Sequence, residues 1–136
     1  MSFLRSTLSL STILIVLVVL GRASSAGEDA PPLTKDNGPW LIQARIFRGP
    51  DAAKLAQILA RELQNEHGLP TYIYRDDQKP YEEISVLVGN SKTKDEAKTL
   101  LKRVKRIVSK QLVDILPASL LDLKYARIVT NPLRMT

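Results

Sequence analysis

A change of hydrophobic period within residues 40–63 constrains the fold of this chain more than any other feature. Residues 40–47 are rich in aromatic and branched apolar side chains, which is typical of a β-strand. After Gly49 and Pro50, leucine and isoleucine recur every three or four residues, the spacing of one helix face. Pro50 suits the first helical turn because its missing N–H would have no partner there. We therefore predict a strand followed by a helix, the first half of a βαβ unit.

The next segment predicts the end of this helix and a hairpin. Gly68 suits the left-handed position that commonly ends a helix, so the helix is expected to run from about Pro50 to Glu66. Extended runs follow at residues 71–75 and 81–89, and a polar turn joins them. Two short strands joined in this way form a β-hairpin.

A capping box marks the start of a second helix. Thr93 is a favourable N-cap residue, and Glu96 follows three residues later, where its side chain reaches back. An apolar stripe continues from there, so the helix is expected to reach residue 111. Residues 116–123 are rich in leucine and are interpreted as a short extra turn at the domain edge. A last strand is expected at residues 125–129.

The predicted order is strand, helix, strand, strand, helix, strand, the split βαβ arrangement of ferredoxin-like α+β folds. Right-handed crossovers place both helices on one face of a four-stranded antiparallel sheet, as a two-layer sandwich with an open second face. The predicted domain covers residues 39–130, and residues 131–136 form a C-terminal tail. The residues expected to be most buried are Ile42, Ala44, Ile46, Leu55, Leu59, Leu63, Val86, Val88, Leu101, Val104 and Val108.

The first 26 residues have the organisation of a signal peptide. A basic start precedes a short apolar run over residues 8–20, and small residues precede a cleavage position after Ala26. The run is shorter than the roughly 20 residues of a spanning helix, so cleavage is favoured over an uncleaved anchor, and no membrane span is expected afterwards. The mature protein is then expected in the periplasm or cell envelope, or secreted. Residues 27–38 are polar and predict a flexible linker.

The composition excludes several kinds of active site. The chain has no cysteine and a single histidine, His67, at a predicted helix end. A general base needs a partner and a cleft, and transition-metal sites are usually built from imidazole or thiolate ligands. We therefore predict no catalytic residues, no metal site, no cofactor and no enzymatic activity.

Positive charge is concentrated in one segment. The net charge of the chain is +6, and residues 91–111 contain eight basic and two acidic residues. On the predicted second helix the basic face consists of Lys98, Lys102, Arg103, Lys105, Arg106 and Lys110. A solvated face opposite the apolar stripe is the favoured interpretation, and contact with phosphates or an anionic surface is the alternative.

The sheet face away from the helices is the predicted binding surface. Strict alternation along the first and third strands places five side chains there. They are Gln43, Arg45, Phe47, Ser85 and Leu87. For Gln43 and Arg45 an ordinary solvated strand face is the alternative. RNA-binding sheets of this kind carry stacked aromatic residues on both central strands, and the third strand has none, so nucleic acid is not expected as a partner.

Several motifs, in this order and spacing, resemble SPOR (sporulation-related repeat) domains. Residues 40–47, WLIQARIF, are similar to the opening strand of that family, with an apolar pair, a glutamine and a closing phenylalanine. Residues 49–59 are similar to its first helix, 86–89 to its third strand and 93–97 to the start of its second helix. The resemblance covers roughly residues 39–107.

The resemblance implies a bacterial, non-enzymatic module with the βαββαβ fold that binds peptidoglycan, favouring glycan strands without stem peptides. The glutamine of the family's sheet face corresponds to Gln43. The chain departs from the family's pattern at Arg45, at Ser85 and at residues 90–91. A second class of function stays open, an envelope adaptor that binds another protein through the basic helix or residues 116–123.

Overall fold

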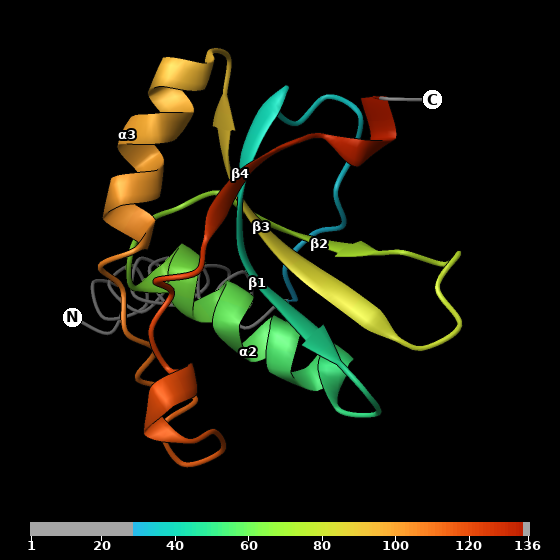
Figure 1. Cartoon of the computed structure of the whole chain (residues 1–136), viewed down its shortest axis with the longest axis vertical. Helices are drawn as coiled ribbons and strands as arrows, with labels where there is room; N and C mark the ends of the chain where they lie inside the picture. Colours follow the sequence, from blue (N-terminus) through green and yellow to red (C-terminus); the bar gives the residue numbers. More distant parts are fainter. Residues whose placement is uncertain (1–28, 135–136) are drawn as a thin grey trace, which may run out of the picture.

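The computed structural model describes residues 29–134, and the predicted signal peptide lies outside them. The elements are β1 (Trp40–Arg48), α2 (Ala52–Asn65), β2 (Thr71–Arg75), β3 (Glu83–Ser91), α3 (Lys94–Val104), η1 (Ala118–Leu120), β4 (Arg127–Thr130) and η2 (Pro132–Arg134). The sheet has the order β2-β3-β1-β4 with antiparallel neighbours. Figure 1 shows α2 and α3 on the same side of it. The predicted ferredoxin-like α+β fold is confirmed.

The expected capping box is present at the start of α3. The Oγ1 atom of Thr93 accepts a hydrogen bond from the N–H of Glu96 at 3.2 Å, and the Glu96 carboxylate accepts one from the N–H of Lys92 at 3.0 Å. These contacts satisfy two N–H groups that would otherwise lack partners at the helix start. The local sequence therefore determines where α3 begins.

The core lies between the sheet and the two helices. The predicted core residues that are buried are Ile42, Ala44, Leu59, Leu63, Val86, Val88 and Val104. Leu55 and Leu101 are partly buried against the same cluster. Full burial of a valine, leucine or isoleucine side chain stabilises the folded state by about 1.5–3 kcal/mol relative to leaving it exposed. Ile46 and Val108 are different, because Ile46 is only partly buried and Val108 is exposed.

A β-bulge in β1 changes which side chains face the helices. Gln43 pairs with Leu87, but Arg45 pairs with Val86, so the register shifts between these two pairs. An extra residue of this kind moves every later side chain of the strand to the opposite face of the sheet. The strict alternation assumed from the sequence therefore ends at Gln43.

Three predictions about β1 are wrong for this reason. Ile46 lies opposite Ser85 on the open face and not in the core. Phe47 lies in the core, where it is 5% exposed. Arg45 lies on the helix side, and its guanidinium donates a hydrogen bond to the carbonyl oxygen of Asp122 at 3.3 Å. The predicted positions of Arg45 and Phe47 on the open face are thus corrected.

Helix α3 ends at Val104, earlier than the predicted residue 111. The chain then turns, and Val108 forms an isolated antiparallel bridge with Asp122. The carboxylate of Glu62 on α2 accepts hydrogen bonds from residues 109–111, which holds this segment against α2 in a non-helical conformation. Val108 is 55% exposed as a result, so its predicted burial is wrong.

Residues 29–38, which we call the N-terminal strap, pack on the domain and do not form the predicted flexible linker. The N–H of Leu33 donates to the carbonyl oxygen of Ile73 at 2.9 Å, and the N–H of Ile73 donates to that of Pro31 at 3.0 Å. The strap therefore runs along the outer edge of β2, and Ala30 and Leu33 are buried.

Asn131 connects the strap to the C-terminal end of the domain through hydrogen bonds. Its side-chain nitrogen donates to the carbonyl oxygens of Thr34 and Asn37, and its Oδ1 atom accepts the N–H of Leu133 at 2.9 Å. Asn131 is 1% exposed. The segment predicted as a tail, residues 131–136, therefore begins with a buried residue of the domain.

We expect Asn131→Ala to lower the free energy of unfolding by about 2 kcal/mol, because three partly buried backbone groups lose their hydrogen-bond partner. Chemical denaturation followed by circular dichroism measures this change. Asn90→Ala is the matched control, since the exposed Asn90 accepts one hydrogen bond, from the N–H of Gly38. We expect a loss below about 1 kcal/mol for the control. Equal losses for the two variants would contradict the role assigned to Asn131.

Candidate functional site

The sheet face opposite the helices is divided into a covered part and an accessible part. In the covered part, Leu33 from the strap packs on Leu41 and Leu87, and Leu133 from η2 is packed against this cluster. Both Leu41 and Leu87 are almost completely buried there. A ligand on this face therefore has access to the remaining part, beyond the strap.

The accessible part is a shallow depression of about 330 Å³. Its polar lining includes Gln43 from β1, Ser85 from β3, Tyr74 from β2 and Arg127 from β4. Ile46 provides apolar surface beside them. The depression thus combines an amide, two hydroxyls, a guanidinium and apolar area on one surface.

Ion pairs form one border of this depression. Nε of Arg48 lies 2.8 Å from an oxygen of Glu83, and Nζ of Lys79 lies 3.5 Å from the other. The hydrogen bond and the charge of Glu83 raise the pKa of Arg48 above its usual value. Both cations are thus paired with the same carboxylate. Arg127 takes part in none of the ion pairs found among residues 29–134.

Tyr74 is a neutral hydrogen-bonding group in this surface. Burial raises the pKa of its phenol above the usual value of 10.0, and the charges of Asp76 and Asp77 raise it further. The phenol therefore keeps its proton at neutral pH and is able to donate and accept hydrogen bonds. Its ring also packs at the border of the apolar cluster, which fixes its position.

The structure brings together three of the five residues predicted for this face. Gln43 and Ser85 line the depression, and Leu87 borders it but is 2% exposed beneath Leu33. Arg45 and Phe47 lie on the helix side because of the bulge. Sequence reasoning missed Tyr74 and Arg127. The alternation in TYIYR, residues 71–75, would have placed both of its tyrosines on one face.

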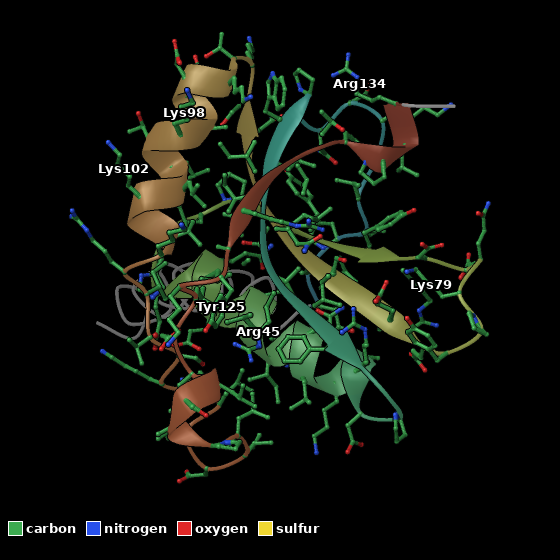
Figure 2. All side chains as sticks on the ribbon, in the orientation of Figure 1. Arg45, Lys79, Lys98, Lys102, Tyr125 and Arg134 are labelled. Atoms are coloured by element: carbon green, nitrogen blue, oxygen red, sulfur yellow. The ribbon has the colours of Figure 1, made fainter. Side chains whose placement is uncertain are left out.

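The basic residues of α3 lie on the opposite layer of the molecule. Figure 2 shows Lys98 and Lys102 pointing away from the sheet. Arg103 is engaged differently, since its guanidinium donates to the carbonyl oxygen of His67 at 2.6 Å. This contact joins α3 to the end of α2 and gives Arg103 a structural role.

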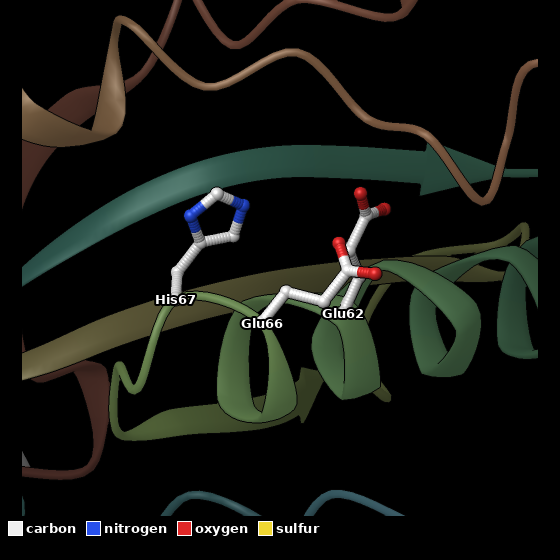
Figure 3. A group of neighbouring side chains, drawn as sticks. All are labelled: Glu62, Glu66 and His67. Carbon is white, nitrogen blue, oxygen red and sulfur yellow. The ribbon is translucent and has the colours of Figure 1, made fainter.

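One group of described side chains, Glu62, Glu66 and His67, has the spacing of metal ligands, with ligand atoms within 4.8 Å of one another (Figure 3). Glu62 is buried, and both of its oxygens accept hydrogen bonds from residues 109–111. This carboxylate therefore holds the chain that follows α3, and we assign Glu62 a structural role.

The fold and the accessible sheet face define a small α+β binding domain. The SPOR domain family matches residues 36–113, more than half of the chain, and the chain belongs to this family. No match was found among curated proteins or among solved structures. SPOR domains are generally peptidoglycan-binding modules, non-catalytic and periplasmic.

None of the helices within residues 29–134 is long and apolar enough to cross a bilayer.

Proposed function

We propose that this protein is an exported, non-enzymatic module that binds the glycan strands of peptidoglycan through the accessible part of its open sheet face. The observation that carries the proposal is the depression in which Gln43, Ser85 and Tyr74 present polar groups on a SPOR domain. Export rests on the organisation of the first 26 residues and on the periplasmic location of the family.

The chemistry of a glycan strand suits this surface. Its hydroxyl and acetamido groups accept and donate hydrogen bonds, and the amide of Gln43 and the hydroxyls of Ser85 and Tyr74 are able to do both. Ile46 provides apolar surface for the faces of the sugar rings. A shallow surface buries little of a ligand, so the affinity of one site is expected to be weak.

We expect Gln43→Ala to weaken binding to purified peptidoglycan sacculi by about 1–2 kcal/mol, roughly a 5- to 30-fold change, because the lost amide leaves ligand groups without partners. Ser85→Ala is also expected to weaken binding to sacculi. Co-sedimentation with sacculi over a range of protein concentrations measures the affinity.

Two controls separate this site from other surfaces. Arg45→Ala removes a charge from the same strand but from the helix side, and binding is expected to stay within about twofold of the unmodified protein. A triple variant of Lys102, Lys105 and Arg106 tests the basic surface of α3 and of the turn that follows it, at low and high salt. If the triple variant lost binding and Gln43→Ala did not, the proposed face would be wrong.

A further inference from the structure

The second half of β1 is a vacant strand edge. Strand β4 pairs with β1 only along Trp40–Gln43, where the last pair is Gln43 with Arg127. Strand β1 continues to Arg48 and keeps β3 on its other side. Within residues 29–134, no strand pairs with residues 44–48 on the β4 side, and Figure 1 shows β4 turning away from this part of β1.

The edge is vacant because the chain before β4 is held elsewhere. The N–H of Ser109 donates to the carbonyl oxygen of Leu121 at 2.8 Å, and the N–H of Leu123 donates to that of Ile107 at 3.1 Å. The N–H of Ala126 closes a turn onto the carbonyl oxygen of Leu123 at 3.0 Å. The residues that precede β4 thus pair with the segment after α3 and are not available to extend β4.

A hollow of about 220 Å³ lies beside this edge. Residues 43–46 form one wall, and Asp122, Leu123 and Tyr125 form the other. Tyr125 is 83% exposed although it is a large aromatic residue. Figure 2 shows Arg45 and Tyr125 in the same region of the molecule. An exposed ring next to a vacant strand edge is a favourable contact for the side chains of an added strand.

The charges near residues 44–48 indicate which kind of ligand would bind at this strand edge. Arg45 lines the hollow, Lys124 lies beside the Tyr125 ring, and Arg127 pairs with Gln43 where the edge begins. None of these three cations belongs to the ion pairs found among residues 29–134, and Asp122 is the one acidic residue in the lining. The Nζ atom of Lys124 lies 5.3 Å from the centre of the Tyr125 ring. A second copy of the chain would bring the same cations against these, which disfavours edge-to-edge dimerisation. An acidic segment complements them.

We propose that residues 44–48 accept an extended, acidic peptide segment of a partner protein as a fifth strand. The backbone of β1 supplies main-chain hydrogen bonds, Tyr125 contacts an apolar side chain of the segment, and Lys124 and Arg127 contact its carboxylates. Lys124 and Tyr125 do not line the depression proposed for glycan, so the two kinds of ligand are distinguishable by mutation.

A blocked seven-residue peptide of alternating threonine and valine with a glutamate at each end is a suitable probe. On binding, NMR is expected to show slower exchange and shifted signals for backbone amides within residues 44–48. Two versions of the peptide, N-methylated at alternate amides in the two possible registers, test whether main-chain hydrogen bonds are made. At least one of them is expected to lose binding.

The double variant Lys124→Glu/Tyr125→Ser is expected to bind the probe about tenfold more weakly while it binds sacculi like the unmodified protein. If both N-methylated peptides bound normally, or if the signals moved on α3 and not on β1, the inference would be overturned. Concentration-dependent dimerisation with protection of residues 44–48 would also overturn it, because the occupant would then be a second copy.

Discussion

Replacing Gly89 with alanine is expected to lower the free energy of unfolding by about 3 kcal/mol. Gly89 lies in β3 with a φ of +94°, a conformation that costs other residues on the order of 1–3 kcal/mol. An added Cβ would also lie 2.4 Å from Cδ2 of Leu100 on α3. Leu100 would have to move, and overpacking of this kind costs about 1–3 kcal/mol. Chemical denaturation followed by circular dichroism measures the loss.

Gly49 provides a control with almost the same φ angle. Its φ is +96°, but an added Cβ meets no atom within 4 Å, so Gly49→Ala reports the backbone strain without the steric contact. In the double variant Gly89→Ala/Leu100→Ala, the loss is expected to be smaller than the two single losses added together, because the smaller side chain leaves room. If Gly49→Ala cost as much as Gly89→Ala, the contact with Leu100 would have no measurable effect.

The order of strands and helices was predictable because each element carries its own period in the sequence. The apolar spacing of α2 and the capping box of α3 are local signals, and the structure confirms both. A right-handed connection then leaves one arrangement for the two helices, on the same face of the sheet. The fold could therefore be predicted from local sequence patterns and general rules of topology.

The candidate site was only partly predictable, because one bulge determines which face of the sheet the β1 side chains after Gln43 lie on. Gln43 precedes the register shift and was placed correctly, whereas Arg45 and Phe47 follow it and were placed on the wrong face. Every residue of β1 is compatible with a regular strand, so the bulge has no clear signal in the sequence. It depends on how β1 fits against β3, a contact between residues distant in the chain.

The strap and the end of α3 were missed for a related reason. The apolar stripe continues past Val104, and nothing local in the sequence ends the helix there. The cause is Glu62, which lies on another helix and binds the backbone after α3. In the same way, the strap has the composition of a linker, and its order depends on Asn131 at the far end of the domain. Such long-range polar contacts are not visible as periodic patterns.

Glu62→Gln is expected to destabilise the domain by about 2–4 kcal/mol. Glu62 is 3% exposed, and its oxygens accept hydrogen bonds from Oγ of Ser109 at 2.6 Å, the N–H of Lys110 at 2.7 Å and the N–H of Gln111 at 3.4 Å. A glutamine presents an NH₂ group to some of these donors, so one of them is left buried without an acceptor. Thermal and chemical unfolding measure the loss of stability.

Glu66→Gln is the matched control, because Glu66 lies one helical turn further on and is exposed. The free energy of unfolding of Glu66→Gln is expected to stay within about 0.5 kcal/mol of that of the unmodified protein, as for most surface substitutions. Added Zn²⁺ is expected to leave the unfolding temperature of the unmodified protein unchanged, because the oxygens of Glu62 are already occupied by donors from residues 109–111. Stabilisation by Zn²⁺ that disappears in both variants would instead identify Glu62, Glu66 and His67 as metal ligands, and the role of Glu62 as the holder of the chain after α3 would then be wrong.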